Sequence, residues 1–378
     1  MERHPLTAVA VASGALEPRH SATCHRFFAR TQWSLAAVGR GLFTLALPGV
    51  PAAQPVYRLL ADTLARKHGQ CIALAPRHHE PWLSTARQPV LSFGHVGIVL
   101  ALWVPWPLGD ARGFALPVLF RLSVGATRGG ERAAPSRPHR GPRYQAAVTA
   151  PAPQPRPTKR AWARELIDRG APWTAGRTVY VVVARAYAAR PLREGRPPHV
   201  PLLSRRRLAA ARWARPPRRR PGQKGRPRRR WIPRPLPLDG RRGCPQVFTR
   251  TVLGYHALRD QPRRRVVVRD PTGQRRAAAF CGTDLPVDAA FSLTGYARRW
   301  TRAVAFDDQK QFLGFAEPQQ QREQAVAHTA PFAGLVYALV LLWAAARVQH
   351  GRPVGWVPRP WYRTKTAPAF VDLLTALR

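Results

Sequence analysis

Asparagine is absent from this chain of 378 residues, and methionine occurs once. Acidic residues are scarce as well: 19 Asp and Glu stand against 62 Lys and Arg, and the formal net charge is +43. Such an excess makes a polyanion a near-obligatory companion and argues against an enzyme of small neutral metabolites. The four cysteines have no CxxC spacing, which argues against a secreted scaffold built on disulfides.

Lysine is nearly missing too, because only five of the 62 basic residues are lysine and the others are arginine. Together with 40 prolines, this bias is typical of a protein encoded by G+C-rich DNA. A wrong reading frame of such DNA would have the same composition, so composition alone leaves both explanations open. The length suffices for one large domain or two ordinary ones with a sizeable core.

Long uncharged runs are rare. Residues 331–346 carry no charge, but these sixteen residues fall short of the roughly twenty that a bilayer needs. We therefore expect a buried core helix there, in preference to a membrane span, and no membrane partner. The short apolar run at residues 6–16 does not have the shape of a signal peptide.

Apolar patterning predicts a mixture of helices and strands. Runs rich in β-branched residues predict strands at 56–64, 90–104, 115–124 and 178–183, and a hairpin of 266–269 with 277–281 around the turn at 270–273. Helical spacing predicts one or two amphipathic helices in 25–46, a short helix at 162–169 and a longer one at 296–315. Residues 125–160 have no periodicity and are interpreted as a loop or linker.

Arginine is concentrated in residues 205–230, a segment that cannot bury a core of its own. Contact with nucleic-acid phosphates is favoured over a solvated run of charge because Trp213 and Trp231 lie beside the arginines. Each neutralised phosphate adds affinity that depends on salt and not on base sequence. The candidate DNA-binding residues of this segment are Arg205, Arg206, Arg207, Arg218, Arg219, Arg220, Arg228, Arg229 and Arg230.

A second pattern lies in the helix predicted at 296–315. At 3.6 residues per turn, Tyr296, Arg299 and Lys310 fall on one face around position 303. A phenol, a guanidinium and an ammonium group on one face suit contact with phosphate. The alternative is a charged helix face in solvent.

This spacing resembles the Y-x2-R-x3-E-x6-K signature of bacterial insertion-sequence transposases with a DDE, ribonuclease H-like catalytic domain. Further similar segments are SATCHRFFARTQWSL (21–35), LADTLARKHG (60–69), STARQPVLSFGHVGIVLAL (84–102), VVVRDPTG (266–273), 306–319, 325–343 and 360–378. The resemblance covers nearly the whole chain and is weakest at 125–158 and 231–260. A wrong reading frame would not reproduce these segments in order, so that explanation is discarded.

The resemblance implies a particular chemistry. In such enzymes three carboxylates hold two divalent metal ions, expected to be Mg²⁺, which activate water or a 3′-hydroxyl for attack on a phosphodiester. The matching positions here are Ala61, Ala184 and Ala303, and a methyl group cannot ligate a metal. Asp62 and Asp307 remain as residual carboxylates nearby. No intact catalytic triad is therefore expected. With alanine at all three positions, we expect neither metal binding by a triad nor cleavage of DNA.

We predict an α/β fold: a ribonuclease H-like mixed sheet flanked by helices, with an N-terminal helical region and an Arg-rich insertion. The expected divisions are 1–50 (helical region), 51–204 (first part of the domain), 205–260 (insertion), 261–350 (second part) and 351–378 (tail helix).

The resemblance further implies a transposase that binds double-stranded DNA at the terminal repeats of its element and resides in the bacterial cytoplasm with the nucleoid. A copy without its triad is either a degenerate transposase or a non-enzymatic remnant that occupies transposon ends. A homodimer with an active copy is a way in which such a remnant would inhibit. A decayed product that does not fold stably is the third alternative.

Overall fold

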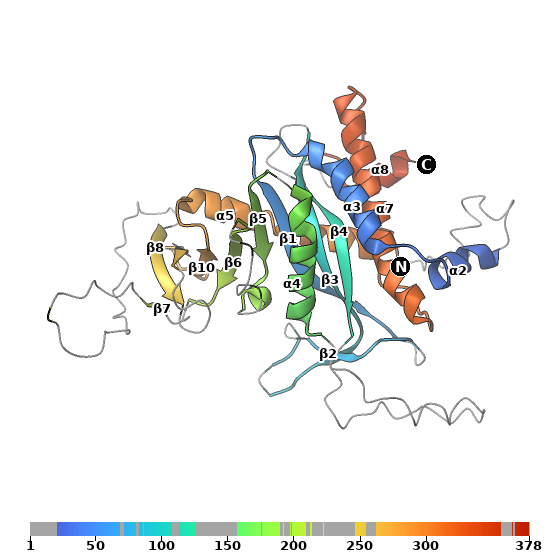
Figure 1. The fold of residues 1–378 in the computed structure, drawn as a ribbon, viewed down its shortest axis with the longest axis horizontal. Helices are drawn as coiled ribbons and strands as arrows, with labels where there is room; N and C mark the ends of the chain where they lie inside the picture. Colours follow the sequence, from blue (N-terminus) through green and yellow to red (C-terminus); the bar gives the residue numbers. More distant parts are fainter. Residues whose placement is uncertain are drawn as a thin grey trace.

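A mixed sheet of ten strands forms the centre of the molecule, and helices cover both of its faces (Figure 1). The computed structural model describes residues 21–68, 72–80, 83–85, 87–107, 113–124, 157–174, 176–189, 192, 197, 199–208, 212–213, 222, 246–254, 262–356, 365 and 367–377.

The strands are β1 (Val56–Arg66), β2 (Arg77–His79), β3 (Leu91–Pro105), β4 (Gly113–Ser123), β5 (Val179–Val183), β6 (Leu202–Arg206), β7 (Arg212–Trp213), β8 (Gln246–Gly254), β9 (Arg263–Arg269) and β10 (Ala278–Gly282). The α-helices are α2 (Ser21–Ala29), α3 (Leu35–Ala46), α4 (Lys159–Gly170), α5 (Ala289–Ala297), α6 (Trp300–Phe312), α7 (Glu323–Gln349) and α8 (Phe370–Ala376). The 3₁₀ helices are η1 (Leu47–Gly49), η3 (Ala171–Thr174) and η4 (Arg185–Tyr187).

The central five strands lie in the order β4–β3–β1–β5–β6. The first three are antiparallel to their neighbours, whereas β1, β5 and β6 are parallel. A parallel neighbour needs a crossover, and α4 lies in the chain between β4 and β5. The predicted fold class, a mixed sheet flanked by helices, is confirmed, and the strand order is consistent with a ribonuclease H-like domain.

Beyond β6 the sheet continues through antiparallel strands β10, β9, β8 and β7. The predicted hairpin is confirmed as β9 and β10. Arg205 and Arg206 belong to β6, and β8 also lies within the predicted insertion 205–260, so parts of that insertion are built into the sheet. Arg218, Arg219, Arg220, Arg228, Arg229 and Arg230 lie outside the described residues.

The prediction of one helix over 296–315 is wrong. The chain forms α5 and α6, joined by a tight turn at Arg298 and Arg299 in which the amide of Arg299 donates to the carbonyl of Tyr296 at 3.0 Å. This hydrogen bond spans three residues, as in a 3₁₀ turn, and so do the next two, from the amides of Thr301 and Arg302 to the carbonyls of Arg298 and Arg299. The helix then ends at Phe312, before Gly314 with its positive φ of 62°. Residues 25–46 likewise form two helices, α2 and α3, which is one of the two arrangements expected.

Alternate residues of β1 face different helices. Arg58 reaches η3, where its Nη2 donates to Thr174 Oγ1 at 3.0 Å, so even-numbered positions face α4 and η3. Ala65 clusters with Phe306 of α6, so odd-numbered positions face α6. The core therefore has two layers, one on each side of the sheet.

The uncharged run at 331–346 lies in α7, and α7 is the helix in the described part of the chain that is long and apolar enough to cross a membrane. It packs beside β4, and a Cβ added at Gly334 would lie 3.3 Å from Pro117 of β4. Tyr337, Ala338, Leu341 and Ala344 of this helix are buried in the main core. These buried contacts are the ones expected of the core helix predicted for residues 331–346.

Arg58 places a buried positive charge at the centre of the sheet, which lowers the stability of the folded state. Its side chain is 1% exposed, and its Nε and Nη1 have no hydrogen-bond partner. Its guanidinium lies over the ring of Phe43 at 5.3 Å, and burial lowers its pKa to about 10. A buried cation without a carboxylate destabilises the folded state.

We expect Arg58→Met to raise the free energy of unfolding by about 1–3 kcal/mol, because it replaces an uncompensated cation by an apolar chain of similar length. Thr174→Val is the matched control: it removes the remaining acceptor and should lower stability. Denaturant unfolding of both variants measures this, and a loss of stability in Arg58→Met would contradict it.

Candidate functional site

The parallel pairing of β1 with β5 brings two of the three predicted triad positions together. Leu60 is the register partner of Val183, so the next residues, Ala61 and Ala184, lie side by side at the end of β5. Neighbouring strands are about 4.8 Å apart. Ala61 is 2% exposed, and Ala184 packs against the main core.

Asp62 is the carboxylate next to this pair, and it is already engaged. It lies on the α4 face of β1, where the ammonium of Lys159 donates to its Oδ2 at 3.1 Å. Tyr187 of η4 lies near it, and burial followed by the negative charge of Asp62 raises the pKa of this phenol, whose hydroxyl has no hydrogen-bond partner in the described part of the chain. The residual carboxylate is thus paired with a lysine at the end of the sheet.

Arg302, the residue before Ala303 on α6, reaches the same place. Its side chain is 5% exposed, and its Nε and Nη1 have no hydrogen-bond partner. Burial and then the charge of Arg299 lower its pKa to about 10, while Asp62 and Tyr187 oppose the shift. A buried guanidinium group therefore lies within electrostatic range of Asp62 and Tyr187.

These residues do not fit a pair of divalent metal ions. Such ions need several anionic oxygen ligands. The three positions predicted for the triad, Ala61, Ala184 and Ala303, carry methyl groups instead. Asp62 is bound to Lys159, and Asp307 is exposed on α6, where it accepts a hydrogen bond from Gln311 Nε2 at 2.8 Å. Among the described residues, no group of three or more His, Cys, Asp or Glu side chains could hold a metal ion.

The phosphate-contact face predicted on one helix is divided between two. Tyr296 is on α5, where its ring packs 5.0 Å from that of Phe280, and the guanidinium of Arg299 lies 5.4 Å from the Tyr296 ring. Lys310 is near the end of α6, half-buried, with its pKa lowered by burial against the opposing effect of Asp307. The structure brings Tyr296 and Arg299 together and leaves Lys310 on the other helix.

The predicted arginines in β6 and just after it differ in their surroundings. Arg205 of β6 and Arg207, which follows the strand, are exposed, whereas burial lowers the pKa of Arg206. Arg205 and Arg207 are thus accessible to a ligand, and Arg206 belongs to the packing of the β6–β10–β9 part of the sheet.

Comparison with known proteins places this geometry in a family. Residues 6–275, well over half of the chain, match the family model of the DDE superfamily endonucleases. The chain therefore belongs to the DDE superfamily endonuclease family, a family related to transposases. The match includes Ala61 and Ala184 and ends before Tyr296 and Ala303. Curated proteins give no match to this chain.

The family assignment implies DNA as the substrate, and DDE enzymes typically use Mg²⁺. Both are properties of the family. At the positions predicted for the first two carboxylates this chain has Ala61 and Ala184, and Asp62 beside them is bound to Lys159.

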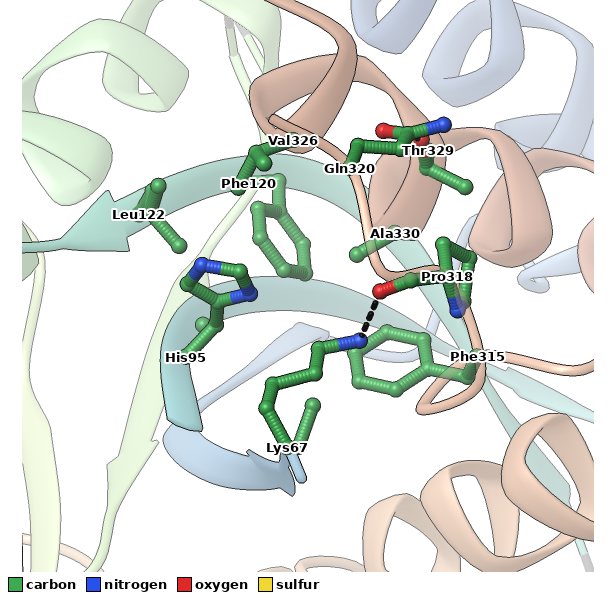
Figure 2. A pocket seen from close by; sticks show the side chains of 12 residues that line it. Lys67, His95, Phe120, Leu122, Phe315, Pro318, Gln320, Val326, Thr329 and Ala330 are labelled. Atoms are coloured by element: carbon green, nitrogen blue, oxygen red, sulfur yellow. Dashed lines mark hydrogen bonds between the residues drawn. The ribbon is translucent and has the colours of Figure 1, made fainter. Parts of the chain in front are cut away.

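A pocket opens just past the end of β1, between the sheet, the segment after α6 and α7 (Figure 2). Figure 2 shows Lys67 reaching across it to the carbonyl of Pro318, to which its Nζ donates at 2.6 Å, and a second bond to the carbonyl of Ala316 measures 2.7 Å. On the far side His95 Nε2 lies 2.7 Å from the carbonyl of Ala73. The polar groups of this pocket are thus used in tying loops to the sheet.

Sequence reasoning missed Lys159 and gave no role to Tyr187, since a lysine at the start of a helix and a tyrosine after a strand are common. The signal for Tyr187 was its place three residues after Ala184. The positive charge of Arg302 could be predicted from its place directly before Ala303. Its burial could not, because the sequence alone does not say which face of the helix packs against the sheet.

Lys67 makes the stability of the protein depend on pH. Its side chain is buried, and burial lowers its pKa from 10.5 to about 8. Above pH 8 the folded state loses this proton while the unfolded chain keeps it, so stability rises with pH. From pH 8 to about pH 9.5 we expect a gain of about 1.5 kcal/mol that Lys67→Met lacks.

The measurement is denaturant unfolding of both proteins at a series of pH values. Other titrating groups are shared, so the difference between the two curves isolates Lys67. Parallel curves would show that Lys67 is solvated and not buried against the carbonyls.

Proposed function

We propose that this chain is a transposase-derived DNA-binding protein that has lost the metal-dependent cleavage and strand-transfer activity of its family. It acts on double-stranded DNA in the bacterial cytoplasm, at the ends of an insertion sequence. The observation that carries the proposal is the buried guanidinium of Arg302, whose pKa responds to the charges of Asp62 and Tyr187, residues that lie one and three positions after Ala61 and Ala184 in the chain.

The electrostatics of the centre support loss of the metal. Two divalent ions add four positive charges, which an active centre balances with carboxylates. Here Asp62 is the nearby acid, and Lys159 pairs with it. The positive charges of Arg302 and Lys159 would repel a metal ion, and too few anionic ligands are present to offset this repulsion. Binding of the ion is therefore strongly disfavoured.

Retention of the fold supports a remaining role in DNA binding. The sheet, the crossover helix and both layers of the core are complete in the described residues. The net charge of +43 requires a polyanionic partner. A protein that kept its core and its charge while losing its carboxylates keeps the means to bind DNA and lacks those to cut it.

We expect no cleavage or strand transfer of duplex DNA carrying the terminal sequences of the element, in Mg²⁺ or in Mn²⁺. Gel analysis of labelled strands measures this, with Asp62→Ala and Asp307→Ala as companion variants. Cleavage that is lost in Asp62→Ala would show a residual catalytic centre. Cleavage that survives both substitutions would show that the catalytic carboxylates lie elsewhere.

Restoring the acids tests the placement of the triad. In an Arg302→Leu background, Ala61→Asp, Ala184→Asp and Ala303→Glu should create a Mn²⁺ site, with Asn, Asn and Gln at the same positions as the control. We expect metal to stabilise the acid variant by about 2.7 kcal/mol at about 100-fold excess over Kd, and not the amide variant. Thermal unfolding with and without Mn²⁺ measures this; equal responses would refute the assignment.

A further inference from the structure

We propose that a basic hollow between α2 and the start of α7 is a binding site for the phosphate backbone of DNA. The hollow is lined by His25, Arg26 and Arg30 from the α2 region, by Arg322 just before α7, and by Ala22 and Ala29. With the solvent at its mouth it encloses about 700 Å³. The inference rests on the proposed function, because it locates a surface on which the DNA would be held.

The lining is unbalanced in charge. Three guanidinium groups and an imidazole line the hollow, and no acidic side chain does. None of the ion pairs found in the described residues involves Arg26, Arg30 or Arg322. Glu323, the first residue of α7, follows Arg322 in the chain and does not line the hollow. Like charges brought together repel, and an anion between them relieves that cost.

The hollow is held in place by packing on both sides. In Figure 1, α2 lies beside the start of α7. The ring of Phe332 on α7 packs edge to face on Phe27 and Phe28 of α2, with centroids 5.8 and 5.2 Å apart. Gln324 Nε2 donates to the carbonyl of Thr31 at 2.9 Å. Because these contacts fix both elements, the arginines project from a preformed surface, and binding has to order only their side chains.

The chemistry of the lining suits phosphate. Guanidinium groups donate two parallel hydrogen bonds to phosphate oxygens, and arginine is the residue of choice for such contacts. The three arginines and His25 supply donors, while Ala22 and Ala29 add no polar group. We therefore infer contact with the DNA backbone at this end of the molecule.

A purely structural role for these residues gives a different expectation. Arg26 lies in the last turn of α2, where a cation interacts favourably with the helix dipole. In that case its removal would lower stability without a particular effect on DNA binding. The two roles are separated by measuring both quantities on the same variants.

The test compares two triple variants with equal loss of charge. One carries Arg26→Gln, Arg30→Gln and Arg322→Gln; the control carries Arg40→Gln, Arg347→Gln and Arg352→Gln, all exposed positions outside the hollow. Binding of a fluorescent duplex is followed by anisotropy at several salt concentrations. We expect the hollow variant to bind at least roughly tenfold more weakly than the control, and its slope of log K against log salt to fall by roughly 2 to 3.

Unfolding curves accompany the binding data, and both variants should melt like the wild type because the substituted side chains are exposed. If the triple variant unfolds, Arg322→Gln against Arg352→Gln gives the same comparison singly, with a slope change of about 1. Equal affinities and slopes in the hollow and control variants overturn the inference. A wild-type protein that does not bind DNA at all overturns the proposed function instead.

Discussion

The parallel pairing of β1 with β5 is the constraint on which the rest of the structure depends. A parallel neighbour requires the chain to leave the sheet and return, and α4 lies on this crossover. The crossover covers one face of the sheet, leaves the other to α6 and α7, and sets Ala61 beside Ala184. Buried valines and leucines on β1 and β5 define the register of the two strands. Because side chains alternate along a strand, a slip of one residue would move each of them to the opposite face of the sheet.

The distribution of charge is the second feature that shapes the molecule. With few acids available, buried arginines such as Arg58 and Arg302 lack carboxylate partners and rely on aromatic rings: Arg58 lies over Phe43 and Arg302 over Phe306. Near Asp62 the described structure places the cations of Lys159 and Arg302. The packing of this part of the sheet comes from the buried valines of β5.

Much of the fold could be predicted from pattern. The strand TVYVVV was recognisable from its β-branched run, and the hairpin of β9 and β10 from the Asp270-Pro-Thr-Gly273 turn, whose Asp270 carboxylate accepts from the amide of Thr272 at 2.9 Å. The interruption at Arg298 and Arg299 was not predictable, because no proline or glycine marks it. At this point the chain contacts the sheet: the guanidinium of Arg298 lies 3.9 Å from the ring of Tyr57 and 4.0 Å from the ring of Trp103. Both rings belong to strands that are distant in the sequence.

The sequence by itself determined strands β1, β3, β4, β5, β9 and β10, the core helix α7 and the excess of positive charge, because these follow from local pattern and composition. Only the tertiary structure decided that strands β2, β6, β7 and β8 form, that Arg302 is buried, that Lys159 neutralises Asp62, and that Arg322 stands opposite Arg26 and Arg30 across a hollow. Each of these juxtapositions joins residues far apart in the chain. Their energies depend on burial and on distance in space, and neither quantity is written in local sequence.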